Sequence, residues 1–251
     1  MESNFSNMAR TVTQIVKATP RREGPATVNR ALPSEAIPFL DPFLAIGEFR
    51  MPAMKGGFGF HPHSGVEFIT YQLDGQLTHS SPDGVSITLK AGDAIHLMAG
   101  EHMVHSETPV GEEESHGIQL WVDVPNLNKN DPHTYKKLDK ENVPVDEENG
   151  VIIRTIVSNE GPLKLHTPAI YLDVLVTNSG NFIYNIPDRW NAFMLILSGN
   201  GEFGKEKTAG NQNDFLVFDK GSTLTATAKE QARFLVLAGQ PLNESGKGMF
   251  G

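Results

Sequence analysis

The stretch that decides the fold of this chain is HPHSGVEFITYQLDGQLTHSSPDGVSITLKAGDAIHLMAGEHMVHSE, residues 61–107. Its apolar runs are short and are bounded by glycine, proline and aspartate, a pattern typical of β-strands joined by tight turns. Glu67–Leu73 is rich in β-branched and aromatic residues and predicts a strand. Asp74-Gly75 is a turn signal, after which we expect Gln76–Ser80 to return as the partner strand. Further strands are predicted at Val85–Leu89 and Ala94–Met98.

The same rhythm extends outward over the rest of the chain. Its 251 residues include 24 glycines and 16 prolines, and no segment predicts a helix longer than about three turns. Another strand is expected at Ile118–Val124, and six follow in the second half: VIIRTIV (151–157), YLDVLVT (171–177), NFIYNI (181–186), AFMLIL (192–197), DFLVF (214–218) and FLVLAG (234–239). The sequence therefore predicts an all-β protein.

The two halves of the chain resemble a diverged internal repeat. HPHSGVEFITYQLDGQLTHS (61–80) and IPDRWNAFMLILSGNGEFGK (186–205) each contain a turn, an apolar strand, a glycine turn and a polar return strand. Gly92-Asp93 similarly corresponds to Asn213-Asp214. Two similar β units in tandem predict two small barrels packed together. We place the first domain at residues 1–130, a polar linker at 131–150 and the second domain at 151–251.

Histidines are concentrated in the first half. Of the nine in the chain, seven lie between residues 61 and 116. His61 and His63 flank Pro62, and residues i and i+2 of an extended segment point to the same side. The proline stiffens the segment, which lowers the entropy lost in holding both rings in place. His105 and Glu107 repeat the same spacing.

If the two pairs lie on adjacent strands, they offer three neutral imidazole nitrogens and one carboxylate oxygen. This donor set suits one divalent first-row metal, which is iron, manganese, nickel, copper, cobalt or zinc. Four protein ligands leave two positions of an octahedral ion open, as a catalytic or sensing site requires. A lone i, i+2 histidine pair also occurs by chance on exposed strands, and it is the second pair that favours the metal site. His79, His96, His102 and His116 lack such a partner and are expected at the surface or behind the ligands.

Composition and charge exclude several classes of protein. The net charge of −9 argues against direct contact with nucleic acid, which needs a basic face. The absence of cysteine excludes disulfides, thiolate metal sites and a cysteine nucleophile. No apolar run reaches the ~18 residues of a membrane span, and residues 1–20 lack the apolar core of a secretion signal. We therefore expect a cytoplasmic protein, without membrane contact, and a monomer.

Four segments together are similar to the pirin family, a two-domain branch of the cupin superfamily. They are DPFLAIGEF (41–49), GFGFHPHSGVEFITYQLDG (57–75), AGDAIHLMAGEHMVHSE (91–107) and GIQLWVDVP (117–125). The resemblance extends from about residue 10 to residue 240. It implies two tandem cupin-type β-barrels packed face to face, with one metal, usually iron, in the first. The ligand roles of the family carry over to His61, His63, His105 and Glu107.

The resemblance implies two classes of function. The first is a quercetin-cleaving dioxygenase that acts on a flavonol and dioxygen, with Glu107 as the base for the substrate hydroxyl and with iron(II) as the cofactor. The alternative is a non-enzymatic, iron-based redox sensor that acts as a transcription-factor cofactor through protein–protein contacts. A metal-bearing scaffold is a third class, because fold does not fix function.

The chain departs from the family at several positions. Ser64 stands where the family usually has arginine, and Val66 where it usually has an aromatic residue. After Glu244 the sequence ends in SGKGMFG, so the closing segment of the second domain looks shortened. The second half aligns Ile186, Asp188 and Arg189 with the ligand stretch, so we expect no metal there. Apolar walls of the substrate pocket are expected from Phe43, Phe58, Phe60 and Met98, which are equally typical of a plain core.

Overall fold

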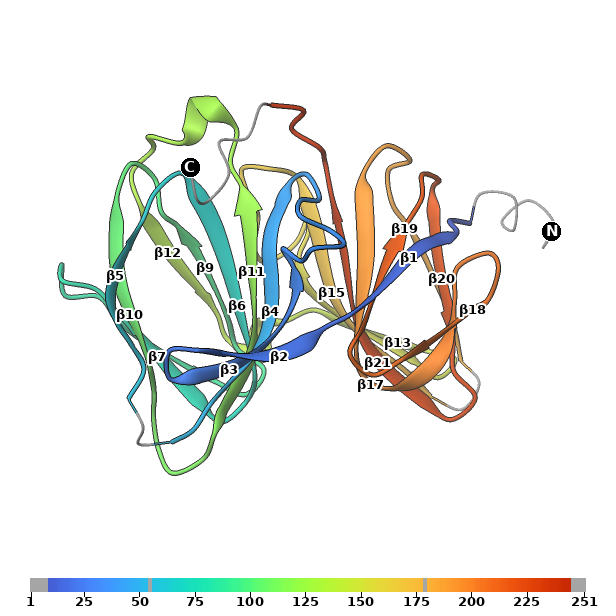
Figure 1. Cartoon of the computed structure of the whole chain (residues 1–251), viewed down its shortest axis with the longest axis horizontal. Helices are drawn as coiled ribbons and strands as arrows, with labels where there is room; N and C mark the ends of the chain where they lie inside the picture. Colours follow the sequence, from blue (N-terminus) through green and yellow to red (C-terminus); the bar gives the residue numbers. More distant parts are fainter. Residues whose placement is uncertain (1–8, 54–55, 178–179, 245–251) are drawn as a thin grey trace. The chain divides into compact units, whose positions relative to one another are not determined.

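The computed structural model describes residues 9–53, 56–177 and 180–244 (Figure 1). Strands dominate these residues, and the helices are two 3₁₀ turns, η1 (Asn126–Asn128) and η2 (Lys140–Asn142). The all-β prediction is confirmed. No helix in the described ranges has the length and apolar character needed to cross a membrane. The chain divides into two compact units. We name Thr19–Val143 with Leu242–Gly251 the histidine unit, and Met1–Ala18 with Pro144–Pro241 the second unit.

The histidine unit consists of two antiparallel sheets. The larger has the order β12 (Thr134–Leu138), β9 (Ala94–Met98), β6 (Val66–Asp74), β11 (Ser115–Asp123), β4 (Phe43–Met51), β3 (Ala26–Leu32), β2 (Thr19–Glu23). The smaller has the order β5 (Phe58–His63), β10 (Met103–Pro109), β7 (Gln76–Ser80), β8 (Ser86–Lys90). Phe68 and Leu97 of the larger sheet share one core cluster with Leu89 and Met103 of the smaller. The sheets therefore face each other and enclose the interior of the unit.

The Asp74-Gly75 turn does not form the expected hairpin. Gln76–Ser80 (β7) is a strand, but it pairs with β10 and β8, whereas β6 pairs with β9 and β11. Gly75 has a φ of +63°, and a Cβ there would lie 2.2 Å from the carbonyl oxygen of Glu114. The turn is thus a corner at which the chain passes from one sheet to the other, and the prediction of β6–β7 pairing was wrong. The next turn does close a hairpin, between β7 and β8.

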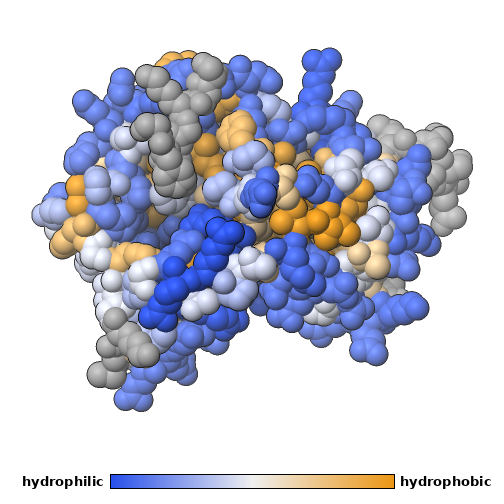
Figure 2. Space-filling view, in the orientation of Figure 1, coloured by the Kyte–Doolittle hydropathy of each residue, from blue (hydrophilic) through white to orange (hydrophobic). Residues whose placement is uncertain are grey.

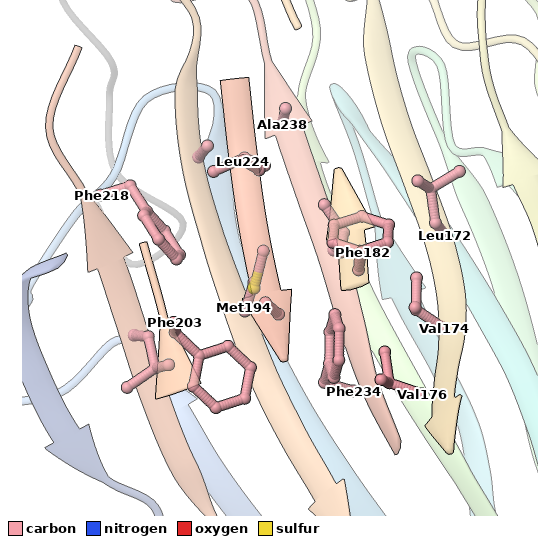
Figure 3. Close-up of a cluster of buried hydrophobic side chains, with 14 of the residues drawn as sticks. Leu172, Val174, Val176, Phe182, Met194, Phe203, Phe218, Leu224, Phe234 and Ala238 are labelled. Carbon is pink, nitrogen blue, oxygen red and sulfur yellow. The ribbon is translucent and has the colours of Figure 1, made fainter. Parts of the chain in front are cut away.

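The second unit is a single extended system of paired strands. Its main path is β1 (Val12–Lys17), β19 (Asp214–Phe218), β17 (Asn191–Phe203), β21 (Gln231–Gly239), β15 (Ala169–Thr177), β14 (Val151–Val157), β13 (Val145–Glu148). Off this path, β18 (Thr208–Asn211) pairs with β17, and β20 (Thr223–Thr227) pairs with β16 (Asn181–Asn185) and β17. Inward side chains such as Phe182, Phe203 and Phe234 form one buried apolar core (Figure 3).

The internal repeat is visible in two pairs of turns. Gly199 repeats the corner of Gly75, with a φ of +75° and a Cβ position 2.1 Å from a carbonyl oxygen. Gly199 lies within one strand, β17 (Asn191–Phe203). The return strand that the repeat predicts after this glycine is therefore the second part of β17 and not a separate strand. The carboxylate of Asp93 accepts a hydrogen bond from the backbone N–H of Lys90 at 2.9 Å. Asp214 does the same for Asn211 at 2.8 Å.

The structure corrects the expected boundaries of the domains. Residues 131–150 are not a free linker, because β12 pairs with β9 of the histidine unit and β13 pairs with β14 of the second unit. Val12–Lys17, expected in the first domain, pairs with β19 of the second unit. β12 and β13 are edge strands; β13 is fully exposed and mostly acidic, and β12 contains two lysines, a composition that resembles a linker. The segment expected to be shortened, residues 245–251, lies outside the described residues, as do residues 1–8 at the amino terminus.

The exposed surface follows the composition of the chain. The face shown in Figure 2 is mostly hydrophilic, as 30 acidic and 21 basic residues predict. His79, His96 and His105 are each at most 6% exposed, whereas His61 and His63 are partly exposed.

Candidate metal centre

Three of the four predicted ligands come together on the paired strands β5 and β10. The strands are antiparallel, with His105 directly opposite His61 and Met103 opposite His63. Because i and i+2 share a face of a strand, the ring of His63 joins the other two. The ligand atoms of His61, His63 and His105 all lie within 4.8 Å of one another. The three imidazoles that the spacing predicted to converge therefore do so.

Neighbouring aromatic side chains hold the three rings. Their ring centroids are 4.5 Å apart for His61 and His105, 4.8 Å for His61 and His63, and 5.1 Å for His63 and His105. The ring of His63 packs edge-on against Trp121, with centroids 4.9 Å apart, and against Phe68 at 4.6 Å. Nδ1 of His61 lies 2.7 Å from the carbonyl oxygen of Gly59. It must donate its hydrogen there, which leaves the Nε2 lone pair free for a metal ion.

The electrostatics of the cluster keep the imidazoles of His63 and His105 neutral. Burial, with the neighbouring His61, lowers the pKa of His63 to about 4. Burial and the adjacent histidines His79, His61 and His63 lower the pKa of His105 to about 2. A protonated ring in this poorly solvated site loses hydration, and a second protonated ring beside it adds repulsion between like charges. Since imidazole binds metal only in its neutral form, the cluster is prepared for a cation at neutral pH.

Glu107, the fourth predicted ligand, lies beside the cluster rather than within it. The register of β10 against β5 shifts between His105 and Glu107, so Glu107 lies opposite Phe58, whereas an unbroken ladder would place it opposite Gly59. Its carboxylate is buried, and Oε1 accepts a hydrogen bond from Nε2 of Gln119 at 2.8 Å. Burial raises the pKa of Glu107 to about 7, although the hydrogen bond from Gln119 opposes the rise. Its role as a ligand stays a prediction.

The residues present fit a first-row transition metal ion. Three neutral imidazoles converge, and the buried carboxylate of Glu107 lies two residues further along β10 from His105. Nitrogen and oxygen donors of this kind suit such ions, and the chain has no thiolate to compete.

Three further residues surround the centre: His79, which was expected either at the surface or behind the ligands, and Gln119 and Trp121, which the sequence did not single out. His79 is buried, with Nδ1 3.4 Å from Nδ1 of His105. Gln119 and Trp121 lie on β11, where Nε1 of Trp121 donates to Oε1 of Gln119 at 2.8 Å. These last two are an i, i+2 pair, the same signal that identified His61 and His63, and it could have pointed to them.

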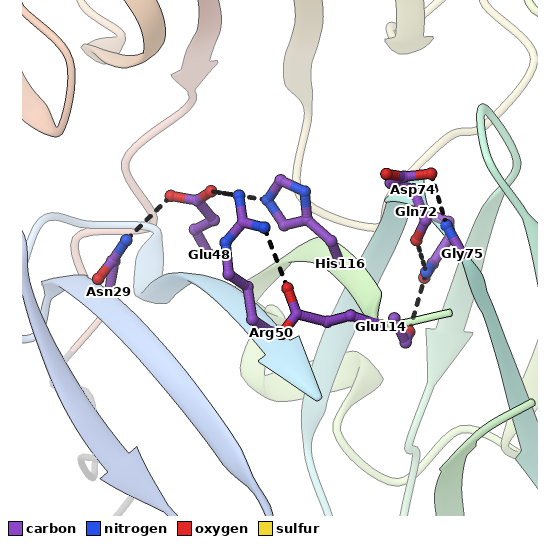
Figure 4. Close-up of polar contacts among 9 residues, drawn as sticks. Asn29, Glu48, Arg50, Gln72, Asp74, Gly75, Glu114 and His116 are labelled. Carbon is purple, nitrogen blue, oxygen red and sulfur yellow. Dashed lines mark hydrogen bonds and ion pairs between the residues drawn. The ribbon is translucent and has the colours of Figure 1, made fainter. Parts of the chain in front are cut away.

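His96, His102 and His116 lie outside the three-histidine cluster. His96 is buried and Nε2 lies 3.0 Å from Oε1 of Glu67. His102 is exposed, which is one of the two positions predicted for it. His116 lies 2.6 Å from Glu48 in a polar network that also contains Arg50 (Figure 4).

That network sets the charge of Glu48. Burial acts to raise the pKa of Glu48, but hydrogen bonds from His116 and Asn29 outweigh it and leave the pKa below its ordinary value. Arg50 also pairs with Glu114 at 3.1 Å (Figure 4). The network is a structural one that involves β3, β4 and β11, and it shares no residue with the three-histidine cluster.

A small cavity of about 50 Å³ adjoins the centre. Its polar wall includes Glu107 and Gln119, and its apolar wall includes Phe49, Phe58 and Trp121. Of the four apolar residues expected to line a pocket, Phe58 is the one found there. Phe43 and Met98 are fully buried in the fold, and Phe60 is 61% exposed, so these three are not part of the wall. The pocket prediction was wrong for them because strand register, not proximity in sequence, decides which face a side chain occupies.

The aligned positions of the second unit have structural environments. Ile186 is part of the apolar core, and the backbone carbonyl of Asp188 accepts a hydrogen bond from Arg10 at 3.2 Å. The described residues hold one group of three or more convergent donors, which is the cluster of the histidine unit. The expectation that the second unit binds no metal stays a prediction.

Comparison with known proteins identifies relatives over nearly the whole chain. The Pirin family model matches residues 26–122, and the model of the Pirin C-terminal cupin domain matches residues 171–247. A pirin-like protein of Solanum lycopersicum is 35% identical over 97% of this chain and 86% of its own length. Pirin-1 of Arabidopsis thaliana is 33% identical over 95% of this chain and 86% of its own length.

Solved structures share the same architecture. A crystal structure from Geobacillus kaustophilus superposes with a TM-score of 0.87 at 28% identity, covering 95% of this chain and 99% of that one. A quercetin 2,3-dioxygenase from Acinetobacter baumannii gives 0.86 at 24% identity, over 95% and 90%. The bacterial pirin YhhW from Escherichia coli, in complex with nickel(II), gives 0.77 at 18% identity, over 91% and 98%. Both units thus have cupin-type folds, and the chain belongs to the pirin family.

Proposed function

We propose that this chain binds one iron(II) ion through His61, His63, His105 and Glu107 and catalyses the oxygen-consuming cleavage of a flavonol of the quercetin class. The observation that carries the proposal is the convergence of three imidazoles next to a cavity whose wall contains Glu107 beside aromatic side chains. A metal centre that served only as a scaffold would need no such space next to it.

The side chains of the cavity have distinct tasks in this proposal. The buried carboxylate of Glu107 accepts the proton of the flavonol hydroxyl as general base. Gln119 fixes the orientation of that carboxylate through its 2.8 Å hydrogen bond, and Trp121 in turn fixes Gln119. Phe49 and Phe58 provide apolar contact for flat aromatic rings.

A bound iron(II) ion would supply Lewis acidity and one-electron chemistry towards dioxygen. The three imidazoles already converge, and burial lowers the pKa values of His63 and His105, which favours its binding. The Acinetobacter baumannii relative in fold supports the substrate class, since it is described as a quercetin 2,3-dioxygenase. The nickel(II) complex of YhhW supports a single transition metal and makes nickel the first alternative to iron.

The test combines elemental analysis with oxygen uptake on one sample. We expect close to one iron-group metal per chain, lost in His105→Ala and retained in His102→Ala, a matched change at an exposed histidine. Iron-loaded protein should consume oxygen with quercetin faster than the same concentration of free iron(II). Glu107→Gln, matched for iron content, should be slower by about 100-fold or more, the usual contribution of a general base. Wild-type uptake no faster than free iron would refute the dioxygenase, and binding to a partner protein would then be the function to test.

A further inference from the structure

His79 contacts two of the proposed ligands at once. It lies on β7 directly opposite Glu107 of β10, and the residue is 1% exposed. Its ring is stacked on that of His105, with centroids 5.5 Å apart and an angle of 19° between the planes. Nδ1 lies 3.4 Å from Nδ1 of His105, and Nε2 lies 3.6 Å from Oε1 of Glu107. The ring therefore faces both ligands and is shielded from solvent.

The Nε2 atom of His79 is buried and has no hydrogen-bond partner among the described residues. A buried N–H in this state costs about 1–3 kcal/mol, so native structures seldom retain one without a reason. The carboxylate of Glu107 is close to this atom, at a distance just beyond a hydrogen bond. That carboxylate is held by Gln119 as well.

The contact between two Nδ1 atoms requires one ring to donate and the other to accept. If His79 donated, its bare Nε2 lone pair would face the carboxylate of Glu107, and two acceptors would repel each other. If His105 donates, its Nε2 keeps a lone pair for a metal ion, and His79 carries its own hydrogen on Nε2, directed at Glu107. A neutral imidazole has one N–H and one lone pair, so the ring has one hydrogen to place. In the second arrangement each nitrogen of His79 faces a complementary group.

We infer that His79 is a positioning residue that orients two metal ligands from behind, accepting the Nδ1–H of His105 and donating its Nε2–H to Glu107. The inference rests on the proposed metal site. Partners of this kind fix the tautomer and the ring orientation of a ligand, and their loss lowers metal affinity by about 10- to 100-fold. His79 itself contributes no ligand atom to the convergent group found among the described residues.

Amide variants separate the two contacts. In His79→Asn the amide reaches about as far as Nδ1 and can restore only the contact with His105. In His79→Gln it reaches about as far as Nε2 and can restore only the contact with Glu107. His79→Leu removes both. His96→Leu is the matched control, because His96 is also buried in the same unit and pairs with a carboxylate, Glu67, outside the centre.

The probe is cobalt(II) alone, titrated anaerobically into metal-free protein in competition with a chromophoric chelator. Folding of each variant is first established by far-ultraviolet circular dichroism and thermal unfolding. We expect wild type and His96→Leu to share one Kd, His79→Leu to bind about 10- to 100-fold more weakly, and each amide variant to fall between. The d–d absorption of the bound cobalt should change in His79→Leu but not in His96→Leu, a signal that a purely structural role would leave unmoved.

The outcomes separate this inference from the proposed function. If His79→Leu and both amide variants bind cobalt as His96→Leu does, with an unchanged spectrum, His79 has no positioning role. If His79→Leu does not fold, the two amide variants decide: a cobalt Kd and a d–d spectrum equal to those of wild type in both would also refute the positioning role. If wild type binds cobalt and the variants weaken as expected but quercetin is not cleaved, the dioxygenase fails and the positioning role stands. If wild type binds no cobalt, both the metal site and this inference are refuted.

Discussion

Replacing Glu107 by glutamine should change how the stability of the metal-free protein depends on pH. Burial raises the pKa of Glu107 from 4.5 to about 7 in the folded chain, whereas the unfolded chain keeps the ordinary value. Below the ordinary pKa the carboxyl is protonated in both states and has no effect on the pH dependence. Between that value and about 7 the unfolded chain releases the proton and the folded chain retains it, so the free energy of unfolding falls as pH rises.

The magnitude follows from the interval between the two pKa values. At about 1.4 kcal/mol per pH unit, the rise from 4.5 to about 7 corresponds to a loss on the order of 3 kcal/mol by about pH 8. Glutamine has no proton to lose and cannot show this loss. The free energy of unfolding of wild type minus that of Glu107→Gln should therefore drop by this amount between about pH 4 and about pH 8. The buried histidines also titrate, but they are present in both proteins and cancel in the difference.

The assay is urea unfolding of chelator-treated protein at a series of pH values, with linear extrapolation to water. The chain has two tryptophans, Trp121 in the histidine unit and Trp190 in the second, so a Trp190→Phe background lets fluorescence report the histidine unit alone. Gln119→Leu provides a further check, because loss of its hydrogen bond to the carboxylate should move the fall to higher pH. A difference that stays constant within about 1 kcal/mol from about pH 4 to about pH 8 would refute the assignment of a protonated, buried Glu107.

Three further predictions follow from other parts of the structure. Arg10→Met should destabilise the second unit by about 3 kcal/mol in urea unfolding, since the fully buried guanidinium donates to several backbone carbonyls that would lose their partner. Gly100→Ala should lower the free energy of unfolding by more than about 2 kcal/mol, because the φ of Gly100 is +60° and a Cβ would lie 1.9 Å from a carbonyl oxygen. Gly84→Ala, which has a positive φ but open space around the Cβ position, should lower it by about 1 kcal/mol. Equal losses in urea unfolding would contradict the steric argument. Phe58→Leu should raise the KM for quercetin while leaving metal content unchanged, and Phe60→Leu, at an exposed site, should alter neither; steady-state oxygen uptake distinguishes them.

Several features of the candidate site could be predicted from the residues alone. That His61 and His63 point to one side follows from the period of two in extended strands, a local property, whereas their meeting with His105 depends on the pairing of β5 with β10. Glu107 shows where this reasoning ends. The i, i+2 rule assumes a regular ladder, and the register shift after His105 removes that regularity.

The sequence by itself determined the all-β class, the position of most strands, the internal repeat and the shared face of His61 and His63, because each depends on local alternation and turn chemistry. Only the tertiary structure decided which strands pair. β7 turns away from β6 to join β10, and this pairing carries His79 to the back of the centre opposite Glu107. Edge strands β12 and β13 likewise join different units although their side chains look like a linker. Pairing between distant segments depends on the burial of whole sheet faces and on backbone hydrogen bonds, which almost every residue can form and which therefore leave little mark on the local sequence.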